Sequence, residues 1–96
     1  MQFVVRYRTV TAQASRLPEV FPRHKAYLDA FQAEHGGVLG IGTFDDPVAN
    51  GSMAVFASRE AAERFVHADP FVVEGLVEPD EVREWDARTF PSADGS

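Results

Sequence analysis

The sequence predicts an α+β domain of the ferredoxin-like type, with its elements in the order βαββαβ. Strands are indicated by apolar residues at every second position, and helices by apolar residues three and four apart. Glycine or proline residues mark most of the boundaries between these segments. In this arrangement a four-stranded antiparallel sheet carries both helices on one face.

The first strand is predicted at residues 3–8. Phe3, Val5 and Tyr7 alternate there with residues of the opposite face, which is the period of a strand. Residues 9–16 are mostly polar and predict a loop that leads into the first helix.

The first helix is predicted to begin near Pro18 and Pro22 and to end at Gly36 and Gly37. Pro22 is expected in the first turn, where its missing N–H costs nothing. Glycine adopts the left-handed conformation that ends many helices. One face of this helix carries His24, Tyr27, Leu28, Phe31 and His35.

The middle of the chain predicts a β-hairpin. Strands are expected at 38–44 and 53–57, and the loop between them is rich in turn-forming residues. Gly40 and Gly42 lie within the first of these strands, which indicates that other atoms approach the backbone closely there.

The second helix is predicted to follow Ser58, a favourable N-cap residue. It ends before Pro70, because a residue that precedes proline disfavours the helical conformation. A short turn at 71–76 and a last strand at 81–90 complete the predicted order. The apolar face of this helix consists of Ala61, Ala62, Phe65 and Val66.

The composition is that of one globular domain. The 96 residues are 45% hydrophobic, enough for one core, so residues 1–90 are predicted as a single domain and 91–96 as a flexible C-terminal tail. The absence of cysteine excludes disulfides, thiolate metal sites and a cysteine nucleophile. The net charge of -6 argues against nucleic acid and against an anionic membrane surface as partners.

The beginning of the chain does not predict a targeting segment. Arg6 and Arg8 interrupt the apolar residues there, and no apolar run approaches the ~20 residues that span a bilayer. We therefore expect a cytoplasmic protein.

The predicted sheet leaves one of its faces without helices. The chain contains 8 phenylalanines, enough bulky residues to make both faces of the sheet apolar. A bare apolar sheet face requires a partner, and a two-fold homodimer is the commonest solution.

The three histidines do not predict a metal site. His24 and His35 are separated by ~16 Å along a helix, too far to share an ion. His67 and Asp69 form only a weak two-ligand fragment. Nucleophile-elbow and phosphate-loop patterns are also absent, so we expect no cofactor.

His24 and Asp69 each allow two interpretations. His24 lies on the apolar face of the first helix, where a core histidine is the commoner explanation. Asp69 precedes Pro70, where a turn or a helix cap is the commoner one. The spacing of these two residues does not decide whether they meet.

Four motifs resemble the YciI-like, or YCII-related, family across nearly the whole chain. They are Pro22-x-His24-x-x-x-Leu28, then Gly42 after a strand, then Ser58-x-Glu60-Ala61-Ala62, and Ala68-Asp69-Pro70-Phe71-x-x-x-Gly75-Leu76. The last motif, with its Asp-Pro-Phe segment followed by glycine, is the most specific.

The resemblance implies a dimeric α+β barrel with a small cleft in each subunit. It also implies a catalytic histidine–aspartate pair, which by position is His24 and Asp69. From their proximity to the motifs, the candidate substrate-binding residues of the cleft are Phe21, Tyr27, Gly42 and Phe71.

Two positions depart from the family pattern. Phe21 stands where members often carry arginine, and Thr43 where they often carry proline. Because an arginine would bind an anion, its loss leads us to expect a neutral or aromatic ligand.

A histidine held by aspartate can act as a general base or acid near neutral pH. The chemistry open to such a pair is proton transfer, as in an isomerase or a lyase that acts on a small organic molecule by elimination. The alternative is a non-catalytic binding module that uses the same cleft, and a purely structural assembly protein is a third possibility.

Overall fold

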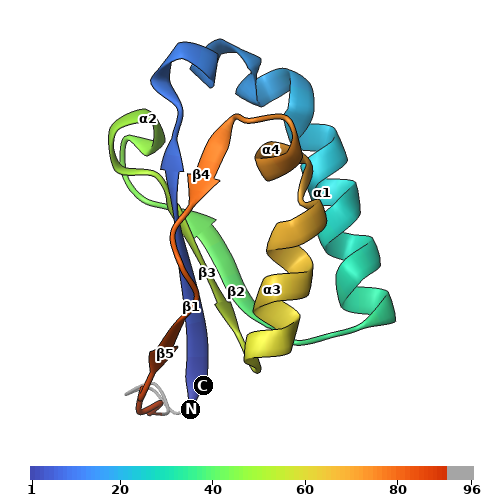
Figure 1. The fold of residues 1–96 in the computed structure, drawn as a ribbon, viewed down its shortest axis with the longest axis vertical. Coiled ribbons are helices and arrows are strands. Elements are labelled where there is room, and N and C mark those ends of the chain that lie inside the picture. Colours follow the sequence, from blue (N-terminus) through green and yellow to red (C-terminus); the bar gives the residue numbers. More distant parts are fainter. Residues whose placement is uncertain (91–96) are drawn as a thin grey trace.

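The computed structural model describes residues 1–90, and the predicted tail at 91–96 lies outside the described residues. The fold is α+β, and its main elements follow the predicted ferredoxin-like order (Figure 1). The elements in chain order are β1 (Gln2–Thr9), the 3-10 helix η1 (Thr11–Arg16), α1 (Leu17–Glu34), β2 (Val38–Thr43), α2 (Pro47–Asn50), β3 (Ser52–Phe56), α3 (Arg59–Ala68), α4 (Pro70–Val73), β4 (Val77–Pro79) and β5 (Arg83–Trp85).

The sheet is antiparallel, with strand order β2-β3-β1-β4, and β5 also pairs with β1. β2 and β3 form the predicted hairpin, with Thr43 opposite Ser52 at its loop end. Figure 1 shows α1, α3 and α4 together on one side of the sheet. The predicted sheet with helices on one face is therefore confirmed.

The last strand differs from the single strand predicted at 81–90. Two short strands, β4 and β5, pair with opposite ends of β1. Residues 80–82 face only residues 5–6 of β1, so one extra residue forms a bulge that separates them. The amide of Asp80 still donates to the carbonyl of Arg6 at 2.8 Å, which keeps the broken edge attached.

α1 begins at Leu17, so its predicted start near Pro18 is confirmed, but the predicted place of Pro22 in the first turn is wrong. Residues 11–16, expected to be a loop, form η1 and lead directly into the helix. Pro18 therefore occupies the first turn and Pro22 lies inside the helix. The predicted end is confirmed, because Gly36 and Gly37 both have positive φ.

Two single-turn helices occupy segments that were predicted as a loop and a turn. α2 lies in the connection of the hairpin, and α4 starts at Pro70 within the predicted turn. Gly51 follows α2 with φ +78, and a Cβ there would lie 2.0 Å from the carbonyl oxygen of Tyr7. Only glycine fits this close approach of α2 to β1.

The core lies between the sheet and the helices. The Phe65 ring of α3 is at its centre, 5.2 Å from the ring of Phe31 and 5.5 Å from that of Phe56. The other large buried side chains are Val5, Tyr7, Val20, Leu76 and Val77.

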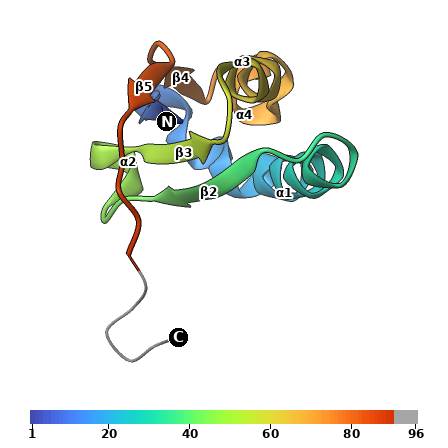
Figure 2. The same cartoon turned by 90° about the horizontal axis from the view of Figure 1, so that it is seen from below.

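In residues 1–90, α1, α3 and α4 leave the opposite face of the sheet uncovered (Figure 2). Val4, Met53 and Trp85 line a shallow hollow of about 220 Å³ there, and Trp85 remains 48% exposed. The structure describes one chain, so the homodimer stays a prediction. Within residues 1–90, no helix has the length and apolar character needed to cross a membrane.

Candidate functional site

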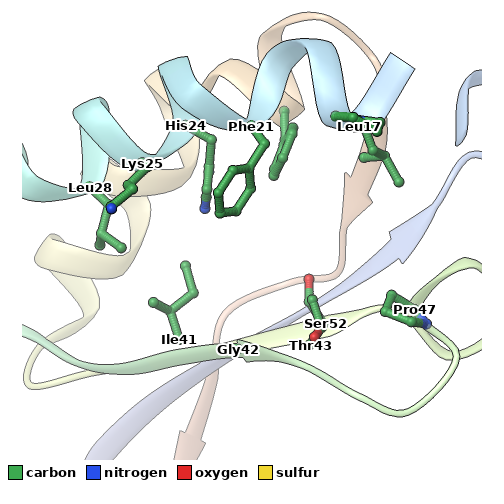
Figure 3. Close-up of a pocket in the computed structure, with 12 residues that line it drawn as sticks. Leu17, Phe21, His24, Lys25, Leu28, Ile41, Gly42, Thr43, Pro47 and Ser52 are labelled. Atoms are coloured by element: carbon green, nitrogen blue, oxygen red, sulfur yellow. The ribbon is translucent and has the colours of Figure 1, made fainter. Parts of the chain in front are cut away.

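A cleft of about 680 Å³ separates the first half of α1 from β2 and the start of β3 (Figure 3). Figure 3 shows side chains of α1 on one wall and those of the hairpin on the other. The cleft is lined by Leu17, Pro18, Phe21, His24, Lys25, Leu28, Ile41, Gly42, Thr43, Pro47, Ser52 and Phe71.

His24 lies on the cleft side of α1 and is hydrogen-bonded to Asp69. Its Nδ1 is 2.9 Å from Asp69 Oδ1, and the side chains are 12% and 3% exposed. Since a carboxylate can only accept, Nδ1 carries the proton of this bond. The other ring nitrogen points into the cleft (Figure 3).

Asp69 is held in place by the local sequence. It ends α3 and caps α4, and its backbone is extended, as expected before Pro70. Its Oδ1 also accepts the Phe71 amide at 3.0 Å. The carboxylate that contacts His24 is therefore fixed by the backbone of the α3–α4 junction.

Aromatic rings restrict the orientation of the His24 imidazole. The Phe71 ring stacks on it, with centroids 4.4 Å apart and an angle of 18° between the planes. Phe21 is tilted relative to it, at 6.3 Å. The His24 ring is thus held by a hydrogen bond at one edge and by an aromatic face.

The predicted wall residues Phe21, Gly42 and Phe71 line the cleft, but Tyr27 does not. The Tyr27 hydroxyl donates to the Phe65 carbonyl at 2.8 Å and so ties α1 to α3. Burial, and then the negative charge of Asp69, raise the pKa of this hydroxyl. We therefore leave Tyr27 out of the proposed site.

Sequence reasoning missed several cleft residues. Lys25 follows His24 directly, so the sequence could have predicted that it lies near the candidate histidine. Thr43 and Ser52 lie opposite each other on β2 and β3. This pairing could be predicted only from the register of the hairpin, which the sequence alone did not give. The other missed residues are Leu17, Pro18, Leu28, Ile41 and Pro47.

Tyr7 lies on the helix-facing side of β1 and is only 5% exposed. Its hydroxyl is buried and has no hydrogen-bond partner among the described residues. Burial raises the pKa of Tyr7 far above its usual range, and Asp69 and Tyr27 add smaller contributions. The negative charge of Asp69 thus adds to burial in favouring the protonated form of Tyr7.

Glu74, at the end of α4, joins α4 to α1. Its carboxylate is 2.9 Å from Arg16 Nη2 and 2.6 Å from Arg23 Nη1. Hydrogen bonds from Arg23 and Arg16 lower the pKa of Glu74. These two arginines thus bind the segment that carries Asp69, and neither lines the cleft.

Within residues 1–90, no group of three or more His, Asp or Glu side chains is arranged to hold a metal ion.

Comparison with known proteins identifies the family. The model of the YCII-related domain matches residues 1–86. The chain belongs to this family. No curated protein matches this YCII-related chain.

A solved structure shows the same fold. It is the 5-chloro-2-hydroxyhydroquinone dehydrochlorinase TftG of Burkholderia phenoliruptrix AC1100, in complex with 2,5-dihydroxybenzoquinone. The match has a TM-score of 0.68 and 23% identity, and covers 90% of this chain and 94% of that one. The likeness covers most of this chain and shows the same fold.

Proposed function

We propose that this YCII-related protein is a cofactor-independent enzyme in which His24 transfers a proton to or from a small organic molecule. The observation that carries the proposal is the 2.9 Å contact between His24 Nδ1 and the buried Asp69 carboxylate. Asp69 holds the ring so that its second nitrogen, Nε2, faces the cleft (Figure 3).

The geometry favours His24 as a general base. With the proton on Nδ1, Nε2 has a free lone pair directed at the ligand. When Nε2 takes a proton, the neighbouring carboxylate offsets the positive charge of the ring. Phe71 keeps water from one face of the imidazole, which strengthens this electrostatic effect.

Proton abstraction next to a carbonyl group allows two reactions. In an elimination, the electron pair of the broken C–H bond forms a C=C bond while a leaving group departs with its own electron pair. In an isomerisation, His24 returns the proton to a different carbon. The name of TftG, a dehydrochlorinase of the same fold, describes an elimination and supports this class.

Hydrogen–deuterium exchange tests the proposal without knowledge of the natural substrate. We expect the protein to accelerate exchange of the α-protons of small enolisable ketones in D2O. The His24→Ala variant should lose about 10²–10⁴-fold of this acceleration, a typical contribution of a general base. NMR spectroscopy of the ketones measures the exchange rate.

His67→Ala is the matched control, because His67 is an exposed histidine in the last turn of α3. It should exchange protons at the wild-type rate. A wild-type protein that binds the ketones in the cleft but leaves exchange at the solvent rate would instead be the binding module that the sequence left open.

The ¹⁵N shifts of the His24 ring provide a second test. At neutral pH we expect the Nδ1–H tautomer in the wild type and a mixture of tautomers in Asp69→Asn. An Nε2–H tautomer in the wild-type protein would contradict the assignment of His24 as the base.

We also propose that the protein is a homodimer through the open face of the sheet. Val4, Met53 and the half-exposed Trp85 form an apolar surface there. Met53→Glu should convert the dimer to a monomer in analytical ultracentrifugation. Val73 is an exposed apolar residue on α4, so Val73→Glu should leave the mass of the dimer unchanged. A monomeric wild-type protein contradicts this assembly.

A further inference from the structure

We infer that the ligand of this cleft is an organic anion with an apolar body, and that the Lys25 ammonium group binds its carboxylate. This inference deepens the proposed function because it concerns the same cleft. It depends on the charges that line the cleft and not on turnover.

Among the described residues, the lining of the cleft includes a lysine, although the protein as a whole is acidic and the Asp69 carboxylate lies behind His24. The chain has a net charge of -6, yet no aspartate or glutamate is among the residues that line the cleft. Lys25 is the only lysine in the sequence, and it lies in this lining beside His24. The Lys25 ammonium group is therefore not neutralised by a carboxylate among the described residues that line the cleft.

Lys25 differs from most of the arginines in its interactions. Within residues 1–90, it forms no ion pair. The arginines that pair with carboxylates are Arg8, Arg16, Arg23, Arg64 and Arg83. Arg6 lies over the Phe44 ring, and Arg59 donates to the Val82 carbonyl. Lys25 thus keeps its ammonium group available for an anion from solution.

The position of Lys25 suits a ligand with a charged end and an apolar end. It lies one turn after Phe21 and one turn before Leu28, so its hydrocarbon stem crosses an apolar wall while its charge reaches water. Phe21 and Phe71 provide aromatic surface beside His24. A carboxylate at Lys25 therefore brings the adjacent carbon atoms of its ligand near the His24 ring.

The hydroxyl groups of Thr43 and Ser52 lie on the opposite wall. They can hydrogen-bond a second oxygen of the ligand. The expectation of a neutral ligand considered only the loss of an arginine at Phe21. The place of Lys25 in the lining leads us to replace that expectation.

A matched pair of ligands tests the inference. Phenylacetate and 2-phenylacetamide have nearly the same shape and differ in charge. We expect the wild-type protein to bind phenylacetate about twofold to fivefold more tightly at low salt, as for an exposed ion pair. The difference should shrink at 0.5 M salt. Titrations followed by amide NMR shifts measure both dissociation constants.

Three variants assign the preference to Lys25. Lys25→Met keeps the length of the side chain without the charge and should bind both ligands equally. Lys25→Arg keeps the charge and should retain the preference. Arg64→Met, which removes a cation from α3 away from the cleft, should leave the preference unchanged.

Equal or tighter binding of the amide by the wild type would overturn the inference, as would an anion preference that persists in Lys25→Met. Failure of phenylacetate to bind at 20 mM would overturn it as well. The deuterium-exchange test is separate from these outcomes. An anion preference without proton exchange would leave Lys25 as the binding group and refute only the proposed catalysis.

Discussion

The two halves of α1 have opposite roles although both carry apolar residues on the face toward the sheet. In the second half, Tyr27 and Phe31 pack on Phe65 of α3, with ring centroids 5.0 Å and 5.2 Å apart. In the first half, Phe21 remains 53% exposed and borders the cleft. An apolar face therefore predicts which side chains of a helix point toward the sheet. It does not predict whether other side chains fill the volume between that face and the sheet.

The difference comes from what lies opposite each half. The second half of α1 meets the large aromatic side chains of the core. The first half faces Thr43 and Ser52 of the hairpin, whose side chains are short. Small residues on the facing wall leave a volume that the aromatic residues of α1 do not fill, so a ligand can enter there.

Removing an aromatic ring from the core that the second half of α1 packs on, and another from the cleft end of α1, should give the largest contrast. Phe65→Ala should lower the free energy of unfolding by about 3–5 kcal/mol, because it leaves a cavity in the core. Phe21→Ala should change it by less than about 1 kcal/mol, since this ring is half exposed. Urea denaturation measures both values. Similar losses would show that the cleft end is packed as tightly as the core.

The hydroxyl groups of Tyr27 and Tyr7 should differ by a smaller amount. Tyr27→Phe removes the bond to the Phe65 carbonyl and should cost about 1 kcal/mol. Tyr7→Phe removes a buried hydroxyl without a partner in residues 1–90 and should be neutral or stabilise by about 1 kcal/mol. Thermal unfolding of the two variants measures the difference. A clear loss in Tyr7→Phe would indicate that its hydroxyl is hydrogen-bonded, for example to water.

The smallest effect is expected at Glu74, which joins α4 to the cleft end of α1. Its lowered pKa means that ionised Glu74 stabilises the folded state above the ordinary value of 4.5. This contribution is lost as the pH falls through the lower, folded-state pKa. The wild type should therefore be more stable than Glu74→Gln at pH 7 and lose that advantage in acid.

Urea midpoints between pH 7 and pH 2 follow this difference. Added salt should reduce it at pH 7, because the arginines that contact Glu74 are partly exposed. A difference independent of pH would mean that the charge of Glu74 does not attach α4 to α1.

Errors in the predicted fold occur where local signals are weak. Residues 81–90 lack a regular alternation, and a bulge divides the last strand into β4 and β5, so the single predicted strand was wrong. Residues 9–16 were predicted as a loop, but residues 11–16 form η1, because their polar composition suits a loop and a 3-10 helix equally. Pro22 was wrongly placed in the first turn of α1, since the helix already begins before Pro18. Strong local signals, such as the Ser58 cap and the paired glycines after α1, were confirmed.

The candidate site was predictable only in part. Family motifs directed attention to His24 and Asp69, and the structure brings them into contact across 45 residues of sequence. Tyr27 was misplaced because residues on neighbouring positions of one helical face can point into the cleft or into the core. Lys25 was overlooked because the family motif Pro22-x-His24-x-x-x-Leu28 directed attention to His24 and leaves position 25 unspecified.

By itself, the sequence determined the first three strands, the helix cap at Ser58 and the conformation of Asp69 before Pro70, because these depend on residues within a few positions of one another. Tertiary structure alone decided that Asp69 meets His24 and that Lys25 faces an open cleft. Both outcomes require α4 to pack on α1, held by Glu74, and short side chains to lie opposite α1. These are contacts between distant segments, which no local pattern encodes.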